Sequence, residues 1–417
     1  MEELWPKMYE WMKDDGMDMS DIAIEVAPVD VGQSGELGLV AKTRLLPGDI
    51  LAWAPTRLLF TKAKAVDHWG DEIEELPDRV AIVLLLIHER FVKGASSKWR
   101  IYWEACPNFE TDCCGPSFLW TEEEQAWLDG SDAMEASRQM QVHLEDEFAD
   151  LQASLFASRP DDFPESSFNK KNYFWASAVV ASRAYGDDGE GNNLAIAPLV
   201  DFINHQPGAL QLTRFSNGIV AYASRGYEPG EQVWVNYGGK SNAELLTQYG
   251  FVDDNNKYDA VYIRMGEHLE VPDEAEEGKR RLLEEVLDGA DPDCGIFKVS
   301  CNPREWQPRL LPAVRALVLD ESKDDLPDTV NDLIAPQEPR IEVMAWGLLE
   351  KAFTARLEEY PASMAEDKAK VANDDLPERV RLALRLRVAE QELLEYALVH
   401  VSEQLQRAKA EVEALPA

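Results

Sequence analysis

Basic residues and long apolar runs are scarce in this chain, and each shortage argues against a class of partner. The 417 residues hold 41 Lys and Arg against 78 Asp and Glu, a formal net charge of -37. Nucleic-acid binders need clustered Lys and Arg, so we expect no nucleic-acid partner and favour a basic protein partner instead. No stretch reaches the roughly 18–20 apolar residues of a membrane span, so we expect no membrane partner either.

Cysteine is also scarce, with five residues at positions 106, 113, 114, 294 and 301. An odd number at irregular spacing does not form a disulfide framework, which favours a reducing compartment. The first three lie close together, but three thiols without a neighbouring His lack the fourth ligand of a structural zinc site. We therefore predict no metal.

Targeting and catalytic signatures are missing as well. The acidic start Met1-Glu2-Glu3 is not typical of signal or transit peptides, and we expect a cytoplasmic or nuclear protein. The chain has no HExxH, paired CxxC, P-loop or GxSxG motif. It also lacks the GxGxxG turn of a Rossmann-type nucleotide site, so a nucleotide-like cofactor must be held in another way.

Strand-like and helix-like patterns alternate along the chain in long blocks. Residues 20–62 and 194–263 read as short strands separated by turns, whereas residues 63–185 carry helical patterns. Within that block we predict helices over Asp78–Phe91, with Asp78 as the cap, and over Glu122–Phe156. A helical insertion between two halves of a small β-fold fits this order.

The remainder of the chain is helical by its pattern. Trp346, Leu349 and Phe353 follow a helical period, and Pro377–Leu415 does so over a long span, with Pro377 suited to a first helical position. The arginines of this last stretch are predicted to form a solvated face balanced by glutamates: Arg379, Arg381, Arg385 and Arg387.

The predicted fold class is α+β. Residues 1–62 and 186–265 form two parts of a small-sheet β core, and residues 63–185 form the helical insertion between them. Residues 266–417 form an all-α C-terminal domain. The composition, 45% hydrophobic and 9% aromatic, is that of a globular protein.

Two apolar stretches end in polar residues that an ordinary strand does not need. Ile196–Ile203 leads into Asn204 and His205, and Val233–Asn236 leads into Tyr237. The two polar tips are candidates for one ligand site.

Further segments accompany these stretches: Gly35–Ala41, Leu46–Leu51, Phe174–Ala176, Ser182–Tyr185, Leu348–Glu350, Glu359–Pro361 and the Arg-rich helix after Pro377. In this order they resemble the SET-domain protein methyltransferases, in the branch of the plant Rubisco large-subunit lysine methyltransferase. The resemblance covers nearly the whole chain. It implies a pseudoknot-like SET core, a C-terminal substrate-binding domain, and S-adenosylmethionine-dependent methylation of a lysine on a non-histone protein, with S-adenosylhomocysteine as the product.

The resemblance also implies where the methyl donor binds. Asn204 and His205 lie against S-adenosylmethionine, and Arg183 offers its planar fork to the carboxylate of the methionine moiety. The glycine-flanked turn near Leu37 brings backbone close to the donor. The implied cofactor-binding residues are Glu36, Leu37, Ser182, Arg183, Asp201, Asn204 and His205.

Tyr237 is the implied catalytic residue. An acceptor lysine, with an ordinary pKa near ~10.4, must lose its proton, and burial beside a cationic sulfonium lowers that pKa. A tyrosine hydroxyl then orients the amine. Tyr185 and Tyr249 are implied to line the acceptor channel. Histidine-directed relatives carry a polar amide where Tyr185 stands, so the aromatic ring favours lysine.

Two alternatives stay open. One is a catalytically silent SET-fold protein-binding module that works through the helical C-terminal domain, against which the intact Tyr237 argues. The other is a protein-histidine methyltransferase, against which Tyr185 argues. The chain departs from many chromatin-directed SET enzymes because no Cys-rich zinc segment follows Tyr237, so helical residues must close the channel. We expect a monomer whose partner is a protein substrate presenting a lysine.

Overall fold

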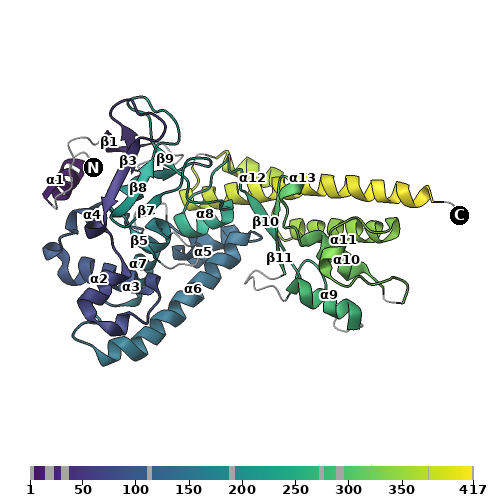
Figure 1. Cartoon of the computed structure of the whole chain (residues 1–417), viewed down its shortest axis with the longest axis horizontal. Coiled ribbons are helices and arrows are strands. Elements are labelled where there is room, and N and C mark those ends of the chain that lie inside the picture. The colour runs from purple at the N-terminus through teal and green to yellow at the C-terminus, as the bar shows by residue number, and fades with distance from the viewer. Residues whose placement is uncertain are drawn as a thin grey trace. The chain divides into compact units, whose positions relative to one another are not determined.

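The computed structural model describes residues 4–14, 23–29, 37–109, 115–186, 193–271, 277–287, 295–320, 322–373 and 375–415. The chain divides into two compact units, coloured along the sequence in Figure 1. The first unit comprises Met1–Thr121, Ala136–Lys240 and Glu244–Phe251. The second comprises Glu122–Glu135, Ser241–Ala243 and Val252–Ala417.

The first unit holds short strands in several small sheets. Its strands are β1 (Ile24–Pro28), β2 (Leu37–Ala41), β3 (Ile50–Pro55), β4 (Ala184–Tyr185), β5 (Ala195–Ile196), β6 (Asn204–His205), β7 (Thr213–Phe215), β8 (Gly218–Tyr222) and β9 (Trp234–Val235). Antiparallel pairs join β1 to β2 and β4 to β5, and β8 lies between β3 and β7. β6 and β9 run parallel.

One sheet joins strands on both sides of the helical block. β3 pairs with β8, so Trp53 lies opposite Val220 and Pro55 lies opposite Gly218. An isolated bridge also joins Phe60 to Ile196. The predicted order, a β core interrupted by helices, is therefore confirmed in space.

Helices make up the rest of the first unit. They are α1 (Leu4–Asp14), α2 (Lys62–Trp69), α3 (Asp78–Ile87), α4 (Arg100–Ala105), most of α6 (Asp132–Leu151), α7 (Lys170–Arg183) and most of α8 (Asn242–Tyr249). Every residue from Val80 to Ile87 is buried, which explains the long apolar run there. Asp78 is not the expected cap: Pro77 precedes the helix, and Asp78 Oδ2 accepts from the Leu194 backbone at 3.3 Å.

The second unit is mainly helical. Its helices are α5 (Glu122–Gln125), α9 (Glu277–Leu287), α10 (Leu310–Val318), α11 (Pro339–Glu358), α12 (Met364–Val371) and α13 (Glu378–Glu413). The prediction of an all-α domain over residues 266–417 misses one strand, β11 (Ile296–Ser300), which pairs antiparallel with β10 (Ala260–Arg264) at the end of the predicted strand block. Alternation along β11 buries Phe297 and Val299 in the core, which favours a strand there.

The long C-terminal helix packs along α11, as Figure 1 shows. Trp346, Leu349 and Phe353 of α11 are buried, as their period predicts, and α13 begins directly after Pro377. The predicted fold class, a small-sheet core with a helical insertion and a helical C-terminal region, is confirmed. In the described part of the chain, no helix combines the length and apolar character needed to span a bilayer.

The arginine face of α13 differs from its prediction. Arg387 is 3% exposed and its Nη2 lies 2.6 Å from Asp367 Oδ2. Arg385 Nη2 lies 2.8 Å from Asp254. Arg379 Nη1 lies 2.7 Å from Glu124. These arginines tie α13 to acids far away in sequence, and they do not form a solvated face.

His88 makes the stability of the first unit depend on pH. Neither nitrogen of this buried ring has a hydrogen-bond partner among the residues that the structure describes, and the ring of His68 lies 4.3 Å away between centroids. Burial, followed by the charges of His68 and Lys93, lowers the pKa of His88 to about 4 from its ordinary 6.5. Glu89 and Asp162 oppose this shift.

Between about pH 6.5 and 4 the unfolded chain therefore binds a proton that the folded chain excludes, and the free energy of unfolding falls as the pH falls. We expect His88→Leu to flatten this part of the pH profile without loss of stability at pH 7. Urea unfolding at several pH values measures the profile. A slope equal to that of the wild type would contradict the prediction.

Candidate functional site

The two polar tips selected from the sequence lie side by side. Asn204 and His205 form β6, which runs parallel to β9 with Asn204 opposite Trp234 and His205 opposite Val235. Since β9 leads directly toward Tyr237, the pairing brings Tyr237 to the end of β6.

A hydrogen bond joins His205 to the backbone of Tyr237. The Tyr237 N–H donates to His205 Nδ1 at 2.9 Å, so the neutral ring carries its proton on Nε2. The two rings lie 5.1 Å apart between centroids, and the Phe251 ring lies 6.1 Å from that of His205. The imidazole thus fixes the backbone that presents the tyrosine.

The Tyr237 side chain is held at both ends. Its hydroxyl donates to the Ile203 carbonyl at 2.9 Å, and its ring stacks on Tyr249 with centroids 4.8 Å apart and planes 24° from parallel. Burial, aided by the charge of Glu244, raises the pKa of Tyr249 to about 12, so this phenol stays protonated at neutral pH. Lys240 Nζ lies 5.8 Å from the centroid of the Tyr249 ring.

Tyr185 lies on β4. Its hydroxyl donates to the Leu212 carbonyl at 2.7 Å. Two residues earlier, the Leu210 carbonyl accepts from the backbone of Asn236 at 3.0 Å, next to Tyr237. The segment from Leu210 to Leu212 therefore contacts both Tyr185 and Asn236, the residue just before Tyr237.

Asn204 also reaches the start of β2. Its Nδ2 donates to the Leu37 carbonyl at 3.2 Å and lies 3.5 Å from Gln232 Oε1. Leu37, Asn204 and His205 are thus brought together, whereas Glu36 lies outside the described residues. Gly38 packs tightly here, because an added Cβ would lie 2.8 Å from Asn204 Nδ2 and 2.9 Å from Gln232 Oε1.

We expect Gly38→Ala to disturb this corner. The new methyl group would displace Asn204, lowering affinity for the expected methyl donor by roughly tenfold and the free energy of unfolding by about 1–3 kcal/mol. Calorimetric titration and urea unfolding measure the two effects. Gly347→Ala is the control: it lies in α11 with open space at Cβ, and it should not weaken donor binding. Unchanged affinity in Gly38→Ala would contradict the prediction.

Arg183 and Asp201, both predicted to bind the donor, pair with each other. Arg183 Nη1 donates to Asp201 Oδ2 at 2.9 Å and to the Asp201 carbonyl at 3.2 Å. Burial opposes the charge of Arg183, but Asp201 raises the pKa of the guanidinium above its ordinary value. Burial raises the pKa of Asp201, while Arg183 and Tyr102 oppose that rise.

Ser182, the remaining predicted donor residue, bonds within its own helix. Its hydroxyl donates to the Ala178 carbonyl at 2.7 Å, the common back-bond of serine in helices. The hydroxyl proton of Ser182 is therefore used in a hydrogen bond within α7.

The backbone ahead of Asp201 is strained. Leu199 is buried and holds φ 76° and ψ -51°, a region that side chains other than glycine rarely adopt. Such conformations cost of order 1–3 kcal/mol and persist where the surroundings fix them. The bend leads into the short turn Val200–Phe202 and then into Asn204.

Tyr102 is the residue that the sequence interpretation missed. It lies in α4, is fully buried, and donates its hydroxyl to Asp201 Oδ2 at 2.6 Å. The signal that could have found it is the aromatic spacing Trp99, Tyr102, Trp103 at a helical period.

One group of possible metal ligands lies in the described part of the second unit: Glu267, His268 and Glu359. His268 Nδ1 accepts from the Arg264 backbone at 2.9 Å, so the neutral ring carries a proton on Nε2, 3.0 Å from Glu359. Arg356 pairs with the same carboxylate at 3.0 Å. These contacts favour a hydrogen-bonded ion network over a metal site.

The cysteine group gives little support to a zinc site. Burial raises the pKa of Cys106 to about 11, which favours the thiol over the thiolate that binds metal. Cys113 and Cys114 lie outside the described residues.

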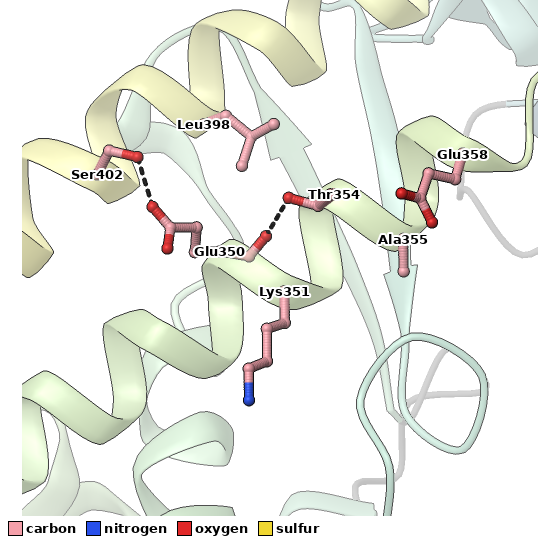
Figure 2. A pocket seen from close by; sticks show the side chains of 7 residues that line it. All are labelled: Glu350, Lys351, Thr354, Ala355, Glu358, Leu398 and Ser402. Atoms are coloured by element: carbon pink, nitrogen blue, oxygen red, sulfur yellow. Dashed lines mark hydrogen bonds between the residues drawn. The ribbon is translucent and has the colours of Figure 1, made fainter.

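A separate open hollow of about 500 Å³ lies between α11 and α13. Figure 2 shows Ser402 donating to Glu350 across it and Thr354 bonding back to the Glu350 carbonyl. Lys351 and Glu358 also line it. Of the segments selected from the sequence, only Leu348–Glu350 contributes to its lining, through Glu350, and none of the predicted donor, catalytic or channel residues lines it.

Two family models match the chain, described as SET domain over residues 36–238 and as Rubisco LSMT substrate-binding over residues 273–394. Actin-histidine N-methyltransferase of Homo sapiens is 25% identical over 423 residues, which cover 95% of this chain and 68% of that protein. The chloroplastic fructose-bisphosphate aldolase-lysine N-methyltransferase of Arabidopsis thaliana is 25% identical over 419 residues, which cover 93% of this chain and 80% of that protein.

Solved structures show the same fold. Rubisco LSMT bound to AdoMet superposes with a TM-score of 0.80 at 21% identity, covering 98% of this chain and 93% of that chain. The SET domain of LSMT bound to lysine and AdoHcy matches with the same TM-score and coverage. The expected resemblance is therefore confirmed.

Proposed function

The chain contains a SET domain followed by a Rubisco LSMT substrate-binding domain, and from this premise we propose an S-adenosylmethionine-dependent protein-lysine N-methyltransferase that acts on a non-histone protein. The observation that carries the proposal is Tyr237, tethered through its backbone to His205 and stacked on Tyr249. In this layout residues 1–62 and 186–265 form the catalytic core, residues 63–185 form the insertion, and residues 266–417 bind the protein substrate.

The proposed donor site fits a nucleotide-like ligand that carries a carboxylate. Gly38 lets the start of β2 approach Asn204 closely, and among the described residues the buried Nε of Arg183 has no hydrogen-bond partner. A guanidinium suits a carboxylate, such as that of the methionine moiety. The proposed donor-binding residues remain those selected from the sequence: Glu36, Leu37, Ser182, Arg183, Asp201, Asn204 and His205.

Tyr237 orients the acceptor amine in this proposal. Because its hydroxyl proton is donated to the Ile203 carbonyl, its oxygen faces an amine as a hydrogen-bond acceptor. Accepting an amine N–H directs the nitrogen lone pair away from the tyrosine. The stacked ring of Tyr249 and the ring of Tyr185 line the acceptor channel, and such rings lower the polarity around a lysine and favour its neutral form.

The chemistry is an in-line displacement at a methyl carbon. S-adenosylmethionine supplies the methyl group: the lysine lone pair forms the new N–C bond as the C–S bond breaks, leaving S-adenosylhomocysteine, and the amine proton passes to water. The Ile203 carbonyl lies beside Tyr237 and is available for weak CH···O contacts to the methyl group.

Lysine is favoured over histidine as the acceptor by Tyr185, an aromatic residue at the exit of the insertion. The two relatives differ on this point, since one is named as a histidine enzyme and the other as a lysine enzyme. The acidic chain, with net charge -37, favours a basic segment around the acceptor. We place the protein in the cytoplasm or nucleus as a monomer.

A catalytically silent binding module is the second candidate, and one experiment separates it from an enzyme. Purified chain, tritiated S-adenosylmethionine and an extract of the source organism should give a discrete labelled protein. Calorimetry with S-adenosylhomocysteine runs in parallel. Donor binding without any labelled protein would favour the silent module, and absence of donor binding would overturn the enzyme.

A further inference from the structure

Tyr102 is attached to the proposed donor site through a buried carboxylate. Its hydroxyl and Arg183 Nη1 both donate to the same oxygen, Asp201 Oδ2, at 2.6 Å and 2.9 Å. The Asp201 side chain is 2% exposed, and its other oxygen, Oδ1, is buried without a hydrogen-bond partner in the described part of the chain. The orientation of this carboxylate therefore depends on two donors that meet at one atom.

Of Tyr102, Asp201 and Arg183, only Arg183 reaches the surface. Its side chain is 16% exposed, against 2% for Asp201, and Tyr102 is fully buried. The guanidinium lies 5.0 Å from the centroid of the Phe202 ring, two residues before Asn204. The chain of contacts thus runs from the core, through the carboxylate, to a cation beside the proposed donor residues.

Loss of the Tyr102 hydroxyl would free this carboxylate to turn. Oδ1 could then replace Oδ2 as the partner of Arg183, because no hydrogen bond from a described residue holds it. Rotation of a carboxylate moves its hydrogen-bonded guanidinium, and a bidentate contact is sensitive to such a displacement. The hydroxyl therefore sets where the guanidinium points.

We propose that Tyr102 is a positioning residue for the methyl donor, acting through Asp201 to hold the Arg183 guanidinium against the carboxylate of the donor. The inference rests on the proposed function and deepens it by assigning a role to a residue in the helical insertion. In this proposal Tyr102 contacts neither the methyl donor nor the acceptor lysine.

The test compares two tyrosines of the same chemistry. Tyr173 is also fully buried and donates to a carboxylate, Glu147, which Arg79 shares. Tyr102→Phe and Tyr173→Phe therefore lose the same kind of bond. Each variant and the wild type are titrated by calorimetry with S-adenosylhomocysteine and with 5′-methylthioadenosine, which lacks the amino-acid carboxylate.

Tyr102→Phe is expected to bind S-adenosylhomocysteine about tenfold more weakly while keeping wild-type affinity for 5′-methylthioadenosine. Tyr173→Phe is expected to keep wild-type affinity for both. Unchanged S-adenosylhomocysteine affinity in Tyr102→Phe, or equal loss of both ligands, overturns the positioning role alone. A wild-type chain that binds neither ligand overturns the proposed function, and the inference falls with it.

Discussion

Tyr237→Phe is expected to lower kcat for methyl transfer by about 100- to 1000-fold while leaving the affinity for S-adenosylhomocysteine unchanged. The phenylalanine ring keeps the stack on Tyr249, and the backbone bond to His205 does not involve the side chain. What is lost is the hydroxyl that donates to Ile203 and orients the amine. In other enzymes, removing a single positioned hydrogen-bonding group lowers kcat by about 100- to 1000-fold.

Single-turnover transfer and calorimetry measure the two quantities separately. Tyr227→Phe is the matched control, because that tyrosine is buried in the first unit and no described residue forms a hydrogen bond with its hydroxyl. It should transfer methyl groups at the wild-type rate. A Tyr237→Phe variant with wild-type kcat would remove the proposed role of the hydroxyl.

Arg315→Met is expected to destabilise the second unit by about 3–5 kcal/mol, because it leaves a buried carboxylate without its cation. Arg315 contacts Glu342 through two parallel bonds of 2.8 Å and 2.9 Å, and both side chains are almost completely buried. Its Nη1 also donates to the Leu333 carbonyl at 2.7 Å, and Trp346 donates to Glu342 at 3.1 Å.

Urea unfolding followed by hydrogen exchange in α10 and α11 reports this unit locally. Arg280→Met is the control, since its pair with Glu284 is 3.7 Å long and both side chains are mostly exposed. That change should stay within about 0.5 kcal/mol of the wild type. Equal urea midpoints for Arg315→Met and wild type would show that the buried pair is not essential to the unit.

The sequence predicts the centre of the site because its signals are local. Asn204, His205 and Tyr237 are polar residues at the ends of apolar strands, which can be recognised without tertiary information. Their pairing follows once β6 and β9 run side by side. The helices of the C-terminal region are similarly visible from the periods of Trp346 and Leu349.

The missed features depend on contacts between distant residues. Tyr102 lies 99 residues from its partner Asp201, and the local aromatic spacing predicts a helix there but not the bond to Asp201. The partners of Arg379 and Arg385 on α13, Glu124 and Asp254, are more than a hundred residues away. Because distant acids cause these arginines to be buried, their burial cannot be inferred from the charge pattern of one helix.

The position of β11 illustrates a different limit. Its first four residues alternate in burial, but so short an apolar segment is also compatible with a helix, and helical patterns surround it. Pairing with β10 decides the outcome.

The identity of the methylated residue decides whether this chain is a protein-lysine methyltransferase. The protein labelled by the wild-type chain and tritiated S-adenosylmethionine is hydrolysed in acid, and its labelled amino acid is separated by chromatography. We expect Nε-methylated lysine, and a labelling rate about 100- to 1000-fold lower when Tyr237→Phe replaces the wild type. Labelled methylhistidine, or a wild-type labelling rate in Tyr237→Phe, would contradict the proposed lysine methyltransferase.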